Sequence, residues 1–352
     1  MRRIPSLDGL RAISITLVIL GHLAHWKHVP AAVLGDYGLL GVQVFFVLSG
    51  YLITNLLLRE YDRTAAIDLR EFYIRRAYRI LPAAFLFLAV ASVIYWREIT
   101  WYHVAAAAFY VANLDPSRPW MFIHLWSLSV EEQFYLIWPL AVKKWHRHKT
   151  AILLCAFWLA PVIRTAVYAF KLHYGIPASL PAQADQLAIG CLLAIYASRV
   201  PKIRRPLALL MLLVVVFFPW FPATSAARTL FMLFVLRPIL FASIAGLVLH
   251  VIQHPYRALN WAPIAWLGKI SYGLYLWQQL FCGNPALEGR YALILPILAC
   301  ACISYYLLEQ PLLRLRERRS RNQSGYLPKA APAPNMLPAP AETATPARGS
   351  VA

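Results

Sequence analysis

The sequence predicts an all-α polytopic membrane protein, a bundle of about ten transmembrane helices with both termini in the cytoplasm. Of its 352 residues, 60% are hydrophobic and only 14% are charged, whereas soluble domains carry about 25% charged residues. The mean hydropathy is +0.56. The first apolar stretch also lacks the small-residue site at which a secretory signal is cleaved. We therefore expect a multi-pass protein of the inner (plasma) membrane.

The individual spans are predicted from apolar stretches of near-membrane length, which lie near residues 7–26, 37–58, 80–96, 125–142, 150–170, 183–198, 206–220, 229–250, 264–282 and 291–312. Lysine and arginine concentrate in the connections on one side, which the positive-inside rule assigns to the cytoplasm. The net charge of +19 therefore reflects the orientation of the protein in the membrane, and we do not interpret it as a sign of nucleic-acid binding. The short segment Trp101–Asn113 would reverse this orientation if it crossed the membrane, so we expect it to be interfacial or re-entrant.

Composition divides the chain into two parts. Residues 1–321 form the predicted membrane domain, and residues 322–352 are rich in proline and alanine, which predicts a disordered cytoplasmic tail. The five cysteines lie in apolar stretches without metal-ligand spacing. We expect them to be packing residues, neither disulfide-bonded nor ligands of a metal.

The first apolar span carries an arginine, Arg11, and a histidine, His22, eleven residues apart. Eleven residues of α-helix make about three turns, so both side chains project from one face about 16 Å apart along the axis. Such residues inside a membrane helix usually mark a site or a pathway. The alternative is a buried pair satisfied by neighbouring polar groups.

A basic cluster precedes the third span. Arg75, Arg76 and Arg79 are spaced three and four residues apart, so their guanidinium groups converge on a helix. Arginine forks suit phosphate groups. The alternative is an ordinary contact with anionic lipid headgroups.

The fourth span opens with the polar segment His124–Tyr135. Glu131 lies at a depth similar to that of His22, and a histidine–carboxylate pair fixes the tautomer of a catalytic imidazole. Glu132 lies about 100° away around the helix, and Glu131 shares its face with Tyr135. We therefore expect Glu131 to be the partner of His22. The alternative is a hydrogen-bond network that holds the bundle together.

Weaker signals occur in three other spans. The pair Ser49-Gly50 is more typical of close helix packing than of a chemical role. Asp185 and Glu309 are expected to pair with arginines for structure.

Five blocks of the sequence resemble the acyltransferase 3 family of integral-membrane acyltransferases, which modify bacterial glycans, lipids and secondary metabolites. The blocks lie between residues 5 and 315 and comprise Ser6–Ile13 with Gly21-His22, Gly41–Tyr51, Arg75–Pro82, His124–Pro139 and Leu267–Trp277. The resemblance implies transfer of an acyl group, usually acetyl, from cytoplasmic acyl-CoA to a hydroxyl of a glycan, a lipid-linked sugar or a related acceptor, without a metal.

The family's functional elements map onto residues already singled out here. Its arginine-to-histidine element in the first helix maps onto Arg11 and His22, its double-arginine element onto Arg76 and Arg79, and its carboxylate element onto Glu131. The chain departs from the family at Gln278, where a histidine is frequent, so no acid–base role is expected there. An esterase-like domain that some members carry is also not expected in this chain.

These elements suggest one geometry. The 3′-phospho-ADP head of the donor would lie at Arg11, Arg76 and Arg79, and its pantetheine arm would bring the thioester to His22 as general base. A histidine acylated in two half-reactions is the alternative mechanism, and Ser127 and Ser129 are candidate oxyanion donors. A proton-coupled transporter or a flippase of lipid-linked sugars is the alternative function.

Overall fold

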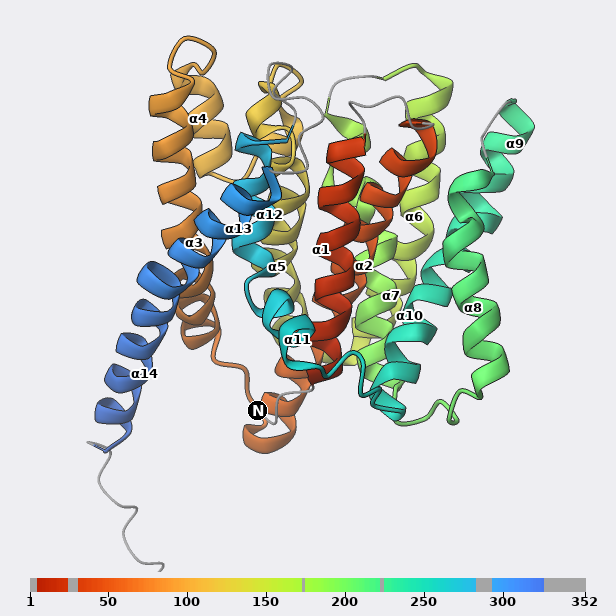
Figure 1. The fold of residues 1–352 in the computed structure, drawn as a ribbon. Helices are drawn as coiled ribbons and strands as arrows, with labels where there is room; N and C mark the ends of the chain where they lie inside the picture. The colour runs from red at the N-terminus through yellow and green to blue at the C-terminus, as the bar shows by residue number, and fades with distance from the viewer. Residues whose placement is uncertain (1–4, 25–30, 173–174, 222–224, 283–292, 326–352) are drawn as a thin grey trace, which may run out of the picture.

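The computed structural model describes residues 5–24, 31–172, 175–221, 225–282 and 293–325, and within these ranges it contains helices and no strand. Most helices run roughly parallel or antiparallel to one another as a single bundle (Figure 1). The start of α1 and the end of α14 lie at the same, lower end of this bundle. The predicted all-α class is confirmed.

The centre of the bundle is made by α1 (Pro5–Ala24), α2 (Ala31–Thr64) and α7 (Leu180–Tyr196). Helix α2 packs against both α1 and α7, and α1 also packs against α11 (Ala262–Lys269). The residues of the predicted first span that follow Ala24 lie outside the described part of the chain.

On one side of this centre lie α3 (Leu69–Ile94), α4 (Trp101–Ala108) and α5 (Leu125–Lys144). Helix α4 has only eight residues and lies beside the upper end of α3 (Figure 1). It is too short to cross a bilayer, so the prediction that residues 101–113 do not form a span is confirmed.

On the other side lie α6 (Lys149–Ala169), α8 (Arg205–Phe217), α9 (Ala226–Phe231) and α10 (Arg237–Gln253). A π-helical turn, Met232–Leu236, joins α9 to α10 without a break. Helices α8 and α9 form one edge of the bundle (Figure 1).

The last part of the chain differs from the two simple spans that the sequence predicts. Residues 264–282 form two short helices, α11 and α12 (Ser271–Trp277), followed by a 3₁₀ turn, Gln278–Leu280. Helix α13 (Ile294–Ile303) continues through a π-helical segment, Ser304–Glu309, into α14 (Gln310–Gly325). Helical structure therefore extends past residue 322, where the disordered tail was expected to begin, and residues 326–352 lie outside the described part.

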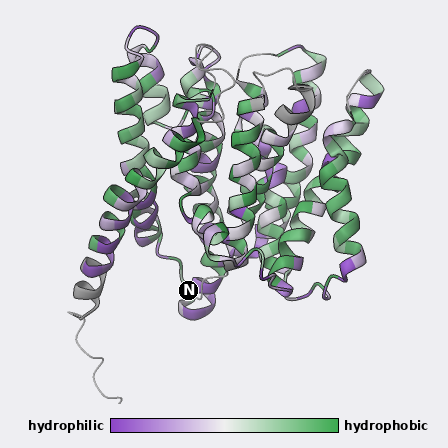
Figure 2. Ribbon diagram, viewed as in Figure 1, coloured by the Kyte–Doolittle hydropathy of each residue, from purple (hydrophilic) through white to green (hydrophobic). Residues whose placement is uncertain are grey.

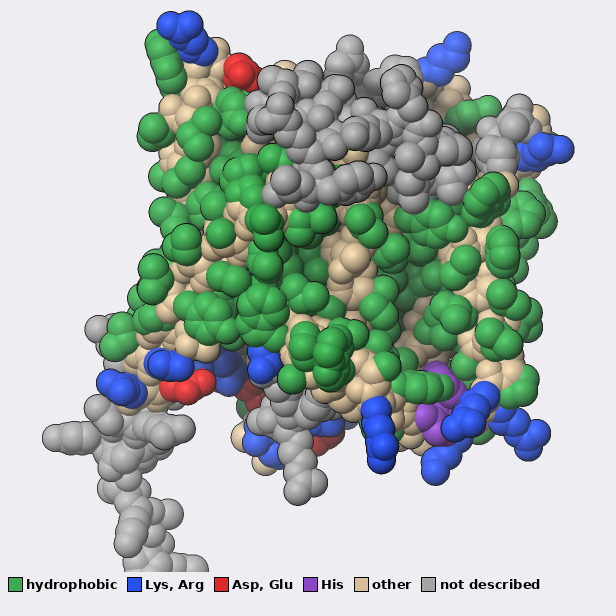
Figure 3. All heavy atoms as spheres, viewed as in Figure 1, with side chains coloured by type: hydrophobic (Ala, Val, Ile, Leu, Met, Phe, Trp, Pro, Cys, Tyr) green, Lys and Arg blue, Asp and Glu red, His purple; other side chains and the backbone are tan. Residues whose placement is uncertain are grey.

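Apolar side chains cover the middle of the bundle, and charged side chains gather at its two ends (Figures 2 and 3). Seven helical segments among the described residues are long and apolar enough to cross a membrane. Of the other predicted spans, α5 carries two glutamates and two lysines, α8 is short, and residues 264–282 are broken in two. The polytopic class is confirmed, whereas the count of about ten spans and the cytoplasmic termini remain predictions.

The close approach of α2 to α7 depends on two glycines. A Cβ atom on Gly50 would lie 2.2 Å from the carbonyl oxygen of Leu187, and one on Gly190 would lie 2.1 Å from that of Val47. Such small residues let membrane helices pack backbone to backbone. The packing interpretation of Gly50 is therefore confirmed.

A buried ion pair joins α6 to α7. The guanidinium of Arg164 binds both carboxylate oxygens of Asp185, with Nη1 3.2 Å from Oδ1, and Nη1 also donates to the carbonyl of Ala182 at 2.6 Å. Both side chains are buried. The expected pairing of Asp185 with an arginine is confirmed, and it fixes the rotation of these two helices relative to each other.

This ion pair predicts a stability effect that depends on both partners. Arg164→Leu should lower the midpoint of thermal unfolding of the detergent-solubilised protein, because it leaves a buried carboxylate unpaired, which costs about 3–5 kcal/mol. The double variant Arg164→Leu/Asp185→Leu is the matched control and should recover most of the loss. Equal midpoints for the single variant and the wild type would mean that the pair does not stabilise the fold.

Candidate active site

Three arginines from two helices gather in the lower half of the bundle. Arg79 of α3 interacts electrostatically with Arg76 of the same helix and with Arg11 of α1. The α-helical spacing brings Arg76 and Arg79 to one side of α3, and the packing of the bundle adds Arg11. The structure thus brings together the three residues that the sequence singles out for binding a phosphorylated donor.

These three arginines lie close together without a direct counter-ion. None of the three forms an ion pair or donates a hydrogen bond among the described residues, and Nε of Arg11 is buried without a partner. By contrast, both terminal nitrogens of Arg164 bind the carboxylate of Asp185, and Arg75 lies 3.7 Å from a carboxylate oxygen of Glu60.

Arg79 is exposed although charged groups surround it. Its nearest counter-charge is Glu309, a buried residue of the π-helical segment before α14, which interacts with Arg79 electrostatically but not as a direct ion pair. The expected pairing of Glu309 with an arginine is thus present only as a charge interaction with Arg79, and the hydrogen bond that Glu309 accepts comes from Ser304. A guanidinium without a direct counter-ion is suited to bind an anion.

A cavity next to this cluster lies between α1, α2, α5 and α12. About 470 Å³ of space free of atoms, part of it open to the outside, lies within this cavity, and its polar wall is formed by Arg11, Glu131, Ser127, Ser271 and two tyrosines, Tyr272 and Tyr275. Its apolar wall consists of Val42, Phe45, Phe46 and Leu128. Arg11 and Glu131, which lie on different helices and far apart in sequence, therefore face the same space.

Two hydroxyl groups hold the carboxylate of Glu131. Both Ser49 of α2 and Tyr135, one turn further along α5, donate a hydrogen bond to its Oε1. The expectation that Glu131 and Tyr135 share a face is confirmed. The role of Ser49 was missed, because the sequence treats it as a packing residue together with Gly50. The only indication of this role in the sequence is that a serine hydroxyl occurs within an otherwise apolar helix.

Tyr135 also contacts the arginine cluster. The guanidinium carbon of Arg76 lies 4.2 Å from the centre of the Tyr135 ring, which is the geometry of a cation–π contact. One buried tyrosine therefore connects a cation of α3 to the carboxylate of α5.

Glu132 has different surroundings. It does not line the cavity that contains Glu131, and its Oε1 is buried without a hydrogen-bond partner. It interacts electrostatically with Arg76 and with Tyr110. The two adjacent carboxylates are thus separated by the turn of the helix, as the sequence predicts.

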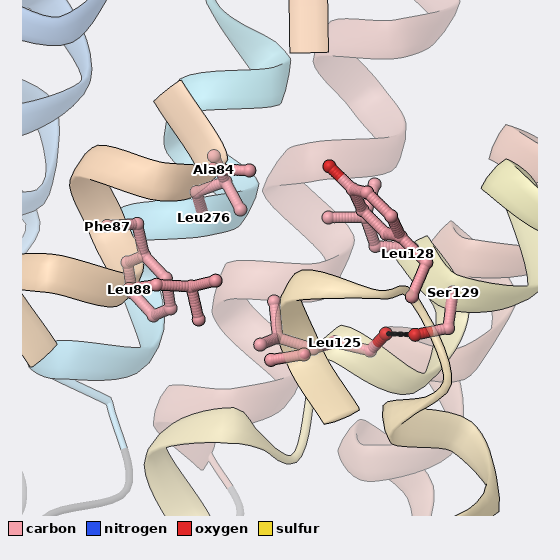
Figure 4. Close-up of a pocket in the computed structure, with 9 residues that line it drawn as sticks. Ala84, Phe87, Leu88, Leu125, Leu128, Ser129 and Leu276 are labelled. Carbon is pink, nitrogen blue, oxygen red and sulfur yellow. Dashed lines mark hydrogen bonds between the residues drawn. The ribbon is translucent and has the colours of Figure 1, made fainter. Parts of the chain in front are cut away.

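A second, apolar cavity lies between α3 and α5. It encloses about 240 Å³ of space free of atoms, and Phe87, Leu125 and Leu276 are among the residues on its wall (Figure 4). Ser129 also borders it, and its hydroxyl donates to the carbonyl of Leu125 at 2.9 Å (Figure 4). The hydroxyl of Ser129 is therefore bonded to the backbone of its own helix.

The other candidate oxyanion donor, Ser127, lines the first cavity together with Tyr275. Their hydroxyl groups are hydrogen-bonded to each other, and that of Tyr275 also donates to the carbonyl of His124 at 2.8 Å. Of the two serines that the sequence suggests, Ser127 is therefore the one that faces the cavity with Glu131.

His22 lies on α1 above Arg11, and the helix between them is unbroken. His124, immediately before α5, is in electrostatic range of its imidazole. Because the hydrogen-bond partners of Glu131 are Ser49 and Tyr135, the pair of His22 with Glu131 stays a prediction. Sequence reasoning missed His124, although it is the first residue of the polar segment that contains Glu131.

None of the His, Cys, Asp and Glu side chains within the described ranges form a group of three that could hold a metal ion. All five cysteines are free thiols, and Cys191 and Cys282 are buried among apolar residues, as expected. Cys155 is exposed and is not a core residue.

Comparison with known proteins supports the resemblance drawn from the five sequence blocks. The family described as an acyltransferase domain matches residues 4–285. The chain is 32% identical over 332 residues to the peptidoglycan O-acetyltransferase OatA of Listeria monocytogenes. This alignment covers 81% of this chain and 50% of that protein.

Other relatives give a similar picture. The identity is 30% to the putative peptidoglycan O-acetyltransferase YrhL of Bacillus subtilis, covering 88% of this chain and 55% of the relative. The identity is also 30% to the O-acetyltransferase OatA of Staphylococcus aureus, over an alignment that covers 93% of this chain and 59% of the relative. The chain thus spans about half the length of the curated relatives it matches, and no solved structure matches it. From the match across most of its length, the chain belongs to the acyltransferase 3 family of integral-membrane acyltransferases.

Proposed function

We propose that this chain is a membrane O-acyltransferase that moves an acyl group, acetyl in the first instance, from cytoplasmic acyl-CoA to a hydroxyl of a cell-envelope glycan such as peptidoglycan or a lipid-linked sugar. The observation that carries the proposal is the cluster of Arg11, Arg76 and Arg79, three arginines without direct counter-ions, beside the cavity that Glu131 lines. The names of the relatives support a peptidoglycan acceptor.

The donor end of the site is the arginine cluster. Three guanidinium groups close together repel one another, and an unpaired cation inside a membrane protein is costly. The phosphates of the 3′-phospho-ADP head would compensate these charges, since arginine forks bind phosphate oxygens bidentately. The exposure of Arg79 gives such a head a point of entry.

The reacting end of the site is His22. The rise of about 16 Å from Arg11 to His22 along α1 is comparable to the length of a pantetheine arm. Neutral His22 would take the proton from the acceptor hydroxyl as its oxygen attacks the thioester carbonyl. When the tetrahedral intermediate collapses, the C–S bond breaks, and the imidazolium returns the proton to the thiolate of CoA.

Glu131 would orient the imidazole of His22 with the substrates in place. Its hydrogen bonds to Ser49 and Tyr135 keep the carboxylate on the wall of the cavity. Ser127 and Tyr275 face the same space and would donate to the oxyanion.

The base is tested by His22→Ala. In proteoliposomes that contain radiolabelled acetyl-CoA and an oligosaccharide acceptor, this variant should lose transfer by about 10²–10⁴-fold, the contribution of a positioned proton acceptor. His148→Ala, which removes an exposed histidine near the lower end, is the matched control and should transfer normally. Full activity of His22→Ala at normal abundance would remove His22 from the mechanism, and absence of acetyl-CoA consumption by the wild type would contradict the donor.

Donor binding is tested at the arginine cluster. Arg79→Ala should raise the KM for acetyl-CoA about ten- to hundredfold, because one charge-assisted hydrogen bond contributes about 1.5–3 kcal/mol. Arg79→Lys should recover only part of this loss, since lysine offers a point charge instead of a fork. Arg147→Ala changes an exposed arginine outside the cluster and should leave the KM unchanged. An unaltered KM for Arg79→Ala would assign the cluster to lipid headgroups.

Substitutions of the two adjacent glutamates should differ in their effect on acyl transfer. Glu131→Gln should nearly abolish transfer, because its carboxylate shares a cavity with Arg11, Ser127 and Tyr275. Glu132→Gln should be milder, since Glu132 lies outside this cavity. Initial rates of both variants with the same acceptor decide the question, and the reverse order would make Glu132 the partner of His22.

A further inference from the structure

A group of buried side chains with unpartnered polar atoms lies where α12 meets the start of α5. The two ring nitrogens of His124, both amide atoms of Gln278, Nε1 of Trp277 and Oε1 of Gln279 make no hydrogen bond with the described residues. All four side chains are more than nine-tenths buried. Buried polar groups in native proteins nearly always have partners, so this concentration indicates that something outside the chain completes them.

The four residues are neighbours in space. The Tyr275 hydroxyl donates to the backbone of His124, and the centres of their rings are 5.4 Å apart. The ring of Phe87 lies 5.3 Å from that of His124 and 5.8 Å from that of Trp277. The backbone of Leu276 is close to the imidazole but not in hydrogen-bonding geometry.

Helical phase directs Gln278 toward the cavity that contains Glu131. Gln278 keeps helical backbone angles at the end of α12. It therefore lies on the face of Tyr275 and Ser271, three and seven residues earlier. Both of these residues line the cavity. Gln278 thus lies one turn beyond Tyr275, which lines the cavity and whose hydroxyl donates to the carbonyl of His124.

The chemistry of this group points to a neutral ligand rich in hydroxyl groups. It offers amide, imidazole and indole groups, and no Asp, Glu, Lys or Arg is among them. A glutamine amide presents two donors and one acceptor side by side, which matches neighbouring hydroxyls on a sugar ring. Phe87, Tyr275 and Trp277 supply the aromatic surfaces on which the apolar face of a sugar packs.

The position of the group relates it to the proposed base. His124 is in electrostatic range of His22, whereas Arg11 lies about three helical turns further down α1. A ligand held by His124 and Gln278 would therefore approach His22 from the side opposite to the arginine cluster.

We propose that His124 and Gln278 form the binding subsite for the acceptor sugar and present its attacking hydroxyl to His22. The proposal rests on the proposed function and adds which residues select the acceptor. The two side chains bind the acceptor in its ground state and take no part in donor binding.

The test measures sugar binding separately from chemistry. The full chain in nanodiscs, without acyl-CoA, is titrated with chitotriose by calorimetry. Gln278→Met, which keeps the volume of the side chain and removes its hydrogen bonds, should raise the Kd about tenfold or more. His124→Phe should do the same, and both variants should keep the wild-type KM for acetyl-CoA.

Two controls separate a binding role from a structural one. Gln186→Met changes another buried glutamine with an unpartnered amide oxygen, on α7 and away from the subsite, and should leave the Kd unchanged. Gln278→His restores hydrogen bonding and should bind chitotriose within a few-fold of wild type, even if Gln278→Met folds poorly.

The outcomes distinguish this proposal from the proposed function. A wild-type Kd for Gln278→Met and His124→Phe, or no binding of chitotriose by the wild type, overturns the subsite. Loss of chitotriose binding in both variants supports it. Absence of acetyl-CoA consumption by a wild type that binds chitotriose would overturn the acyl-CoA donor and leave the subsite standing.

Discussion

The arrangement of the bundle depends on charge that is not compensated by direct contacts. Arg11, Arg76 and Arg79 gather without an ion pair, inside a protein whose surroundings penalise unpaired cations. Elsewhere in the bundle the two terminal nitrogens of Arg164 bind the carboxylate of Asp185 in a direct ion pair that joins α6 to α7. The chain thus contains an arginine that is paired between two helices, and a cluster of arginines that we propose the phosphates of the donor complete.

The glycine contact between α2 and α7 helps to position the polar groups at the cavity. Gly50 and Gly190 bring α2 and α7 into backbone contact, which places Ser49, the neighbour of Gly50, against α5, where it binds Glu131. The carboxylate of Glu131 in turn lines the cavity between α1, α2, α5 and α12. The close packing of α2 against α7 therefore sets the position of Ser49, which holds the carboxylate of Glu131 on the wall of the cavity.

Much of the fold could be predicted from the sequence because the membrane makes polarity expensive. Apolar length located most helices, and the shortness of residues 101–113 excluded a further span. Periodicity also placed Arg76 with Arg79 and separated Glu131 from Glu132. Contacts between helices could not be predicted in this way, since periodicity gives the faces of one helix but not its rotation against the next. Ser49 and His124 were missed for this reason, and residues 264–282 were taken as one span although Gly268, packed on the backbone of Asp8, precedes a break at Ile270.

The site also shows why a single pairing of base and carboxylate is too simple a description. Glu131 is held by Ser49 and Tyr135, and the ring of Tyr135 carries the guanidinium of Arg76. The carboxylate is thus linked through one aromatic ring to the cluster proposed to bind the donor. His22, higher on α1, is near His124, which belongs to the group proposed to bind the acceptor. Since Glu131 and His124 both lie on α5, about two helical turns apart, this one helix carries a contact to each end of the site and sets the distance over which the two substrates must meet.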